Sequence, residues 1–117
     1  MSGKAKKIYI DGIEYVPKSD DEISENYYLV RTYSAGVFVG EIVKKEGKEV
    51  ELKNARRIWY WDGAASLSQL AMEGTKKPEN CKFPCEVKNI ILTEAIEYIK
   101  CTTAAQKSIK GVPEWKK

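Results

Sequence analysis

The sequence predicts an α+β fold: a compact antiparallel sheet of about five strands with two short helices, in one domain spanning residues 1–117. Most β-branched and aromatic residues lie in short alternating runs that Gly, Asn and Asp turns separate. Only two segments carry helix caps, and both are short. The length of 117 residues and the apolar fraction of 43% suit a single globular domain with a modest core.

The first half of the chain predicts a hairpin followed by three strands. Residues 7–16 alternate around Asp11-Gly12, a dipeptide that is typical of a two-residue hairpin turn. The polar and acidic residues 17–26 predict a connecting loop. The predicted strands are residues 27–33, 37–45 and 49–53, with tight turns at 34–36 and 47–48.

The second half predicts two helices and further extended segments. Ser66 is a candidate N-cap for a helix over 66–73, which Gly74 would end. Thr102 or Thr103 can cap a second helix over 104–109, which Gly111 would end. Residues 58–61 can continue the preceding strand, 76–84 form a proline-marked loop, 87–92 form a strand, and 95–100 form a strand or a short helical turn.

The composition limits the classes of function. Twenty basic and 17 acidic residues give a net charge of +3, and the charges are mixed along most of the chain. This balance suits a small anionic ligand better than long nucleic acid, which needs a clustered basic face. The chain has no histidine, so it lacks the commonest general base and the commonest metal ligand.

Three cysteines and the hydropathy pattern bear on the compartment. Cys81, Cys85 and Cys101 are an odd number, which favours reduced thiols in a cytosolic protein. The Cys-x-x-x-Cys spacing lacks a second pair or a histidine to complete a zinc site. No apolar stretch approaches 20 residues, and none follows the basic start, so we expect neither a membrane span nor a secretory signal.

The most informative run is Asn54–Ser66, in which two arginines precede three aromatics and a turn of small residues. Arginine binds phosphate oxygens in a bidentate manner, and aromatic faces stack on bases. On a strand Arg57, Trp59 and Trp61 share one face and Arg56 lies on the other. Arg57 is either a phosphate ligand or a solvated or ion-paired side chain. The indoles are core or interface anchors, or one of them lines a pocket.

Three further segments carry candidate binding residues. Arg31 and Tyr33 share a face beside the small turn 34–36, which either aims backbone amides at an anion or is an ordinary hairpin. Phe83 lies on a loop with a lysine and a proline, where it either stacks on a base or pins the loop to the core. Lys107, on the last predicted helix, lies on a solvated face or reaches the ligand of a neighbouring subunit.

Four stretches of the sequence resemble the first-described phage anti-Thoeris family. They are VRTYSAGVFVG (30–40), LKNARRIWYWDGAASLSQLA (52–71), PENCKFPCEV (78–87) and ILTEAIEYIKCTTAAQKSI (91–109). The likeness extends over roughly residues 7–115 and includes rare combinations such as RRIWYWDGA. Members of that family are small proteins that sequester the cyclic ADP-ribose isomer made by a bacterial TIR-domain defence enzyme.

The resemblance implies a protein that binds and sequesters glycocyclic ADP-ribose without cleaving it. Such a protein would act in the cytoplasm of the infected bacterial host and block Thoeris immunity. The resemblance also implies a β-rich subunit that self-associates as a dimer or hexamer, with nucleotide pockets between subunits and a second site for cyclic oligonucleotide signals. We also expect no cofactor, no metal, no long nucleic acid and no membrane as a partner.

Nine residues inside the matching stretches are candidates for this ligand site, with roles assigned by their chemistry. The candidates for phosphate contacts are Arg31 and Arg57. The candidates for stacking on adenine or walling the pocket are Trp59 and Phe83. The candidates for contacts to ribose or to a base edge are Tyr33, Ser34, Asn54 and Ser66, with Lys107 contributed by a neighbouring chain.

Three other classes of function stay open on the residues alone. Interleaved arginines and aromatics also suit a small phage protein that binds single-stranded nucleic acid, although the scattered acids argue against it. An enzyme that cleaves the nucleotide would need Asp62 or Glu73 as a base, and no paired-carboxylate spacing supports that reading. A structural phage protein would use the aromatics as interface anchors.

Overall fold

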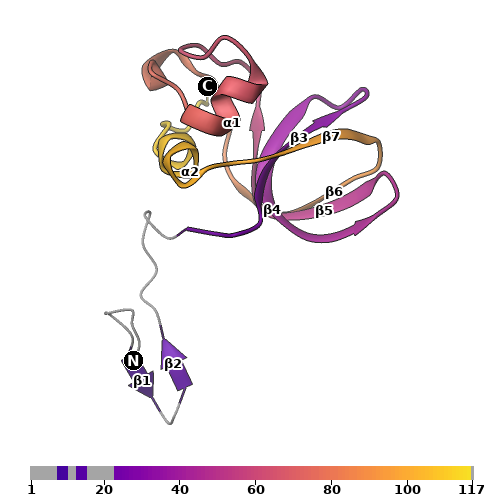
Figure 1. The fold of residues 1–117 in the computed structure, drawn as a ribbon, viewed down its shortest axis with the longest axis vertical. Coiled ribbons are helices and arrows are strands. Elements are labelled where there is room, and N and C mark those ends of the chain that lie inside the picture. The colour runs from indigo at the N-terminus through magenta and orange to yellow at the C-terminus, as the bar shows by residue number, and fades with distance from the viewer. Residues whose placement is uncertain (1–7, 11–12, 16–22, 117) are drawn as a thin grey trace.

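The computed structural model describes residues 8–10, 13–15 and 23–116. A short hairpin consists of β1 (Ile8–Ile10) and β2 (Ile13–Tyr15), which pair antiparallel. The predicted pairing of these two segments is confirmed, whereas the Asp11-Gly12 turn and most of the predicted 17–26 loop lie outside the described residues. The main sheet is antiparallel and five-stranded, in the order β6-β5-β4-β3-β7, and it confirms the predicted α+β class (Figure 1).

The bounds of the elements follow the predictions closely at most positions. The strands of the main sheet are β3 (Tyr27–Thr32), β4 (Val37–Glu46), β5 (Glu49–Ile58), β6 (Val87–Leu92) and β7 (Ala95–Lys100). The helices are α1 (Leu67–Glu73) and α2 (Thr103–Lys110), with a 3₁₀ turn η1 (Pro78–Asn80) between α1 and β6. The segment 95–100 is a strand rather than a helical turn. The strand predicted to end at residue 53 instead runs on to Ile58, where it ends.

A bulge explains why β5 is longer than predicted. Where β4 has one residue, Gly40, the opposing strand β5 has two, Asn54 and Ala55. Asn54 takes a left-handed backbone conformation with φ 53°, which Asn tolerates better than most residues. A Cβ on Gly40 would lie 3.0 Å from the Cα of Ala55, so this close approach favours glycine. The bulge lets β5 continue towards the arginine pair.

The two edge strands of the sheet are consecutive in the chain, and this forces the sheet to curl. Only Thr93 and Glu94 connect β6 to β7, and two residues cannot span five strands that lie about 4.8 Å apart. Hydrogen bonds hold the closed corner, since the N–H of Ala95 donates to the carbonyl of Lys48 and that of Tyr33 to the carbonyl of Glu94. Figure 1 shows β3 and β7 on one side of the curl and β5 and β6 on the other.

Each face of the curled sheet has its own core. We call the face inside the curl the inner face; it buries Val30, Phe38, Val50, Leu52, Ala55, Leu92 and Ala95. We call the opposite face the helix face, because α1 and α2 both pack on it (Figure 1). The core of the helix face includes Tyr27, Leu29, Val39, Ile58, Leu70, Phe83 and Ile109. Neighbouring residues on one strand therefore enter different cores.

Both predicted helix caps are confirmed. The hydroxyl of Ser66 accepts a hydrogen bond from the backbone N–H of Gln69 at 3.2 Å, and Gly74 ends α1 with φ 78°. Thr102 caps α2 by accepting from the N–H of Ala105 at 3.1 Å. The same Thr102 hydroxyl donates to the carbonyl of Met72 at 2.7 Å. The residue that caps α2 therefore also provides a hydrogen-bond donor for a carbonyl in the last turn of α1.

The cysteines differ in access, and we expect their reactivity to follow. All three are free thiols; Cys81 and Cys101 are buried and Cys85 is exposed. Burial raises the pKa of the Cys101 thiol to about 12, which suppresses the reactive thiolate. Brief alkylation with iodoacetamide at pH 8 should modify Cys85 alone, and denaturant should expose the other two. Peptide mass spectrometry reads the result, and early labelling of Cys101 would contradict this burial.

The same burial predicts a loss of stability at alkaline pH. The pKa of Cys101 rises from about 8.5 in an unfolded chain to about 12 in the fold, and burial also raises the pKa of Tyr27. A raised folded pKa contributes stability that is complete below pH about 8.5 and is lost as the pH climbs towards 12. Urea midpoints measured from pH 7 to 11 should fall above pH 9. In Cys101→Ala the midpoint should fall less steeply with pH.

Candidate functional site

Arg56 and Arg57 lie on opposite faces of the sheet, as their adjacency on a strand predicts. Arg56 points to the helix face and is 7% exposed. Arg57 is exposed and lies against Phe38 of the inner face. The pair thus places one guanidinium in the protein interior and one at the surface.

Arg56 is enclosed by backbone carbonyl groups. Its guanidinium donates to five of them, at 2.8 Å to Phe83, 2.9 Å to Val112, 3.1 Å to Ile109, 3.2 Å to Pro84 and 3.4 Å to Pro113. Burial lowers the pKa of Arg56. These bonds join β5 to the loop before β6 and to the carbonyls at the end of α2, where a cation is favourable. We therefore assign Arg56 a structural role.

Arg57 is held in one position while its guanidinium stays exposed. Its Nη1 donates to the carbonyl of Ala35 at 2.7 Å, and its Cζ lies 4.5 Å from the centroid of the Phe38 ring. Within the part of the chain that the structure describes, no carboxylate forms an ion pair with it. The bond to Ala35 uses one of five N–H donors. A fixed, exposed guanidinium of this kind is suited to bind an oxyanion.

The loop 33–36 forms the wall beside Arg57 and is ordered by Thr32. The Thr32 hydroxyl donates to the carbonyl of Gly36 at 2.7 Å and accepts from the N–H of Ala35 at 3.0 Å. Ser34 donates to a carboxylate oxygen of Glu94 at 3.1 Å, and Tyr33 is 78% exposed. We call Arg57 together with this loop the Arg57 corner. The role of Thr32 was missed, although a Thr shortly before a Ser-Ala-Gly run is a recognisable turn signal.

The second predicted phosphate ligand, Arg31, lies on the other face. Arg31 pairs with Val37 on β4, whereas Arg57 pairs with the next residue, Phe38, and successive residues of a strand point to opposite faces. The Nε of Arg31 donates to Glu97 at 2.8 Å in an exposed ion pair. The structure therefore brings Arg57, Tyr33 and Ser34 to one corner and separates Arg31 from Arg57.

The structure corrects the stacking role expected of Phe83. The ring is 0% exposed and belongs to the core of the helix face, so it has no free surface for a base. Its centroid lies 5.4 Å from the guanidinium of Arg56, and its carbonyl accepts from the N–H of Trp115. Phe83 thus pins its loop to the core, which is the alternative left open by the sequence.

The shared face predicted for Arg57, Trp59 and Trp61 is wrong, because β5 ends at Ile58 and the alternation ends with it. Trp61 packs against the core of the helix face, and its Nε1 donates to the carbonyl of Ala64 at 3.2 Å. Trp59 is 64% exposed. One indole is thus partly buried and the other is open to a ligand or a partner.

A cluster that sequence reasoning missed lies beyond Trp59. Tyr60 forms an isolated bridge with Lys82, and the Lys82 ammonium lies 5.9 Å from the Tyr60 ring centroid and 5.6 Å from that of Trp115. A parallel bridge between Phe83 and Glu114 brings the C-terminal tryptophan there. The bridge between Phe83 and Glu114 joins residues about 30 apart in sequence. No local sequence pattern could therefore have predicted this cluster.

The remaining candidates have other partners in the subunit. The amide of Asn54 donates to Glu41 at 3.3 Å beside the bulge, and the Ser66 hydroxyl caps α1. Lys107 is exposed in the last turn of α2. A direct role for Asn54 or Ser66 would require these structural hydrogen bonds to be shared with the ligand.

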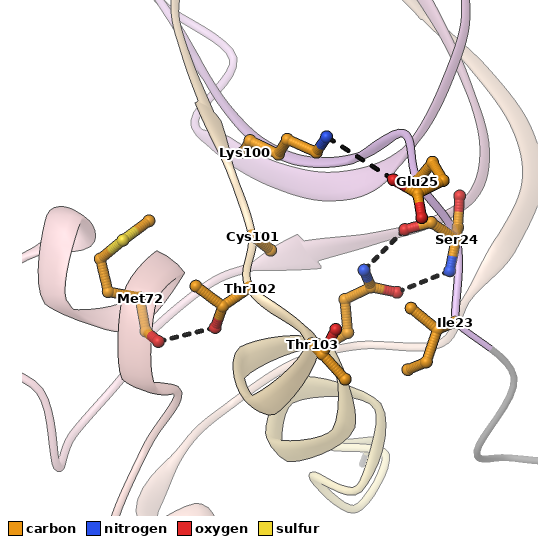
Figure 2. A pocket seen from close by; sticks show the side chains of 9 residues that line it. Ile23, Ser24, Glu25, Met72, Lys100, Cys101, Thr102 and Thr103 are labelled. Carbon is orange, nitrogen blue, oxygen red and sulfur yellow. Dashed lines mark hydrogen bonds and ion pairs between the residues drawn. The ribbon is translucent and has the colours of Figure 1, made fainter.

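A cavity of about 390 Å³ lies between the N-terminal segment and the helices (Figure 2). Four of its polar residues are paired two by two. Gln106 accepts from the N–H of Ser24 at 3.0 Å and donates to its carbonyl at 2.7 Å, and Lys100 lies 3.8 Å from Glu25. We interpret this cavity as a structural contact between residues 23–25 and the end of β7 with α2, because these two pairs hold its walls together.

Two features of the described residues bear on the class of site. None of the helices in that part of the chain is long and apolar enough to cross a membrane. Among the same residues, no group of three or more His, Cys, Asp or Glu side chains is placed to hold a metal ion.

Fold and site together define a small α+β domain whose curled antiparallel sheet presents a fixed, exposed arginine at one corner. Residues 25–109 match the family described as a domain of unknown function (DUF6948), and the chain belongs to this family. The match runs from the segment before β3 into α2, so it includes the Arg57 corner and both cores. No curated protein matches the chain, and no solved structure matches it.

Proposed function

We propose that this protein binds and sequesters glycocyclic ADP-ribose, the signal made by a TIR-domain enzyme, without cleaving it. In this proposal it acts in the cytoplasm of an infected bacterium and blocks Thoeris immunity. The observation that carries the proposal is Arg57, whose guanidinium is fixed by Ala35 and Phe38 yet exposed to a ligand. The resemblance in sequence supplies the identity of the ligand, and the corner supplies the chemistry that would hold it.

The groups at the corner match the parts of a nucleotide with a pyrophosphate. Arg57 can hold two phosphate oxygens at once. The exposed ring of Tyr33 provides a surface on which a base can stack, and the Ser34 hydroxyl, which donates to Glu94, can still accept a hydrogen bond from a ribose hydroxyl. The chain has no histidine to act as a general base, which supports retention of the ligand rather than turnover.

Tight sequestration requires that the corner be covered. A Kd of about 1 nM corresponds to a binding free energy of about −12 kcal/mol. Pockets that bind so tightly bury most of the ligand surface. Arg57 and Tyr33 are exposed in the single subunit. We therefore propose that a second subunit closes the corner in a dimer or hexamer. The exposed Trp59 and Tyr60 are residue types that interfaces favour.

Titration calorimetry with purified glycocyclic ADP-ribose tests the function. Heat denaturation and mass analysis of the released ligand then follow. We expect tight binding and intact ligand, with weaker binding of linear ADP-ribose, which carries the same pyrophosphate in an open chain. Recovery of cleaved ligand would make the protein an enzyme and overturn the proposal. Absence of binding, together with salt-dependent binding to single-stranded DNA, would favour the nucleic-acid alternative.

Light scattering coupled to size-exclusion chromatography tests whether a second subunit covers the Arg57 corner. We expect a mass of at least two subunits and no loss of assembly when the ligand is added. A monomer at micromolar concentration, with or without ligand, would overturn the proposed closure by a second subunit.

A further inference from the structure

A second cavity, of about 440 Å³, opens at the far end of β4 from the Arg57 corner. Arg57 pairs with Phe38 near the start of β4, whereas the cavity involves Ile42–Lys45 near its end. The lining residues are Asn26, Tyr28, Ile42, Val43, Lys44, Lys45 and Tyr98. They include two lysines and two tyrosines, and none of them is acidic.

A bulge in β4 directs Lys45 into this cavity. Ile42 pairs with Leu52 and Lys45 pairs with Val50, so the step from the first pair to the second is three positions along β4 but only two along β5. Leu52 and Val50 both lie in the core of the inner face, so Lys45 shares that face with Ile42. Regular alternation would have turned Lys45 outwards. Bulges that re-aim a side chain are common next to binding sites.

Tyr98 carries a hydroxyl that lacks a partner. It lies on the inner face, because it pairs with Val30 of that core. Its hydroxyl oxygen is buried and makes no hydrogen bond within the described residues. The Lys45 ammonium lies 5.1 Å from the centroid of its ring. Because buried polar groups are normally paired, we look for an acceptor of this hydroxyl outside the described part of the chain.

The charges around Tyr98 indicate what that acceptor is. Neither Lys44 nor Lys45 forms an ion pair with any residue of the described part of the chain. The lining offers as donors the Lys45 ammonium, two phenol hydroxyls and the Asn26 amide, with a further positive charge on Lys44, while the Tyr28 ring, Ile42 and Val43 supply apolar walls. An oxyanion can accept hydrogen bonds from these donors, and a flat apolar body can pack against these walls. The cavity volume lies in the range of small-molecule sites.

We propose that this cavity is a second ligand site, distinct from the Arg57 corner, for a small aromatic organic anion. The oxyanion accepts hydrogen bonds from the Lys45 ammonium and the Tyr98 hydroxyl, and Lys44 adds positive charge. The aromatic body of the ligand packs against Tyr28 and Ile42. This site does not depend on the function proposed for Arg57, and either can fail without the other.

Calorimetry with phenyl phosphate as the probe tests the site in the full-length protein. Inorganic phosphate and phenol, the two halves of the probe, serve as comparisons. We expect phenyl phosphate to bind at least about tenfold more tightly than either half, because the site engages both parts. Equal binding of inorganic phosphate alone would overturn the proposal, since it would show a simple charge effect.

Variants show where in the molecule phenyl phosphate binds. Lys45→Gln should weaken binding of phenyl phosphate about tenfold, whereas Lys88→Gln, which removes a lysine from exposed β6, should not change it. Tyr98→Phe should weaken binding without lowering the thermal midpoint, because the hydroxyl has no hydrogen-bond partner among the described residues. A lower midpoint with unchanged binding would make the hydroxyl structural and overturn the proposal. Loss of binding in Arg57→Ala but not in Lys45→Gln would also overturn it.

Discussion

Replacing Arg56 with alanine is expected to lower the free energy of unfolding by about 3–5 kcal/mol. The change removes the cation to which five carbonyl groups are hydrogen-bonded, and it leaves them in an interior that water does not reach easily. It also opens a cavity beneath the ring of Phe83. A domain of this size has about 5–15 kcal/mol in total, so much of the protein would unfold under mild stress.

Urea denaturation followed by circular dichroism measures this loss. Arg56→Lys should recover little of it, because a single ammonium cannot reach five carbonyls on two different segments as a planar guanidinium does. Arg57→Ala is the matched control, since it removes the same side chain one residue away; we expect a change of roughly 1 kcal/mol or less. If Arg56→Ala and Arg57→Ala shift the midpoint equally, the buried role of Arg56 is wrong.

The second large effect is on binding, and it falls on the neighbouring residue. Arg57→Ala is expected to weaken binding of glycocyclic ADP-ribose about 10- to 100-fold, because a charge-assisted hydrogen bond to phosphate contributes about 1.5–3 kcal/mol. The fold should be retained, since Arg57 is exposed and makes one hydrogen bond to the loop beside it. Calorimetry on the variant, with its urea midpoint as a check of folding, measures the effect.

Two further variants sharpen this test. Arg57→Lys keeps the charge but loses the bidentate geometry, so we expect binding between that of the wild type and that of Arg57→Ala. Arg31→Ala removes an arginine that pairs with Glu97 on the other face, and we expect a smaller loss than at Arg57. Should Arg31→Ala abolish binding while Arg57→Ala does not, the ligand lies on the other side of the loop.

The parts of the fold that follow from local chemistry were predictable. Ser66 and Thr102 cap their helices with hydrogen bonds to residues three positions along, and a short window of sequence contains everything those bonds require. Most strand segments were likewise found, because alternation is a local pattern. The segment 95–100 was ambiguous until its pairing with β3, about 66 residues away, was known.

The candidate site was harder to predict, because it depends on contacts between distant segments. Strand alternation correctly separates Arg56 from Arg57 but cannot tell which one is buried. That choice is made by the carbonyls of Ile109 and Val112 at the end of α2. Phe83 was misplaced for the same reason, since its loop folds under Arg56. The end of β5 at Ile58 overrode the alternation that placed Trp61 beside Arg57.

The two-residue link between β6 and β7 also sets an order of events as the chain folds. Pairings between β3, β4 and β5 join neighbours in sequence and can form early, whereas β7 must find β3 across a separation such as the 66 residues between Arg31 and Glu97. Until β7 docks, Val30 and Phe38 of the inner face lie open to water and to other chains. Closure is therefore a late step, and a ribosome must release most of the chain before either end of the closed sheet takes shape.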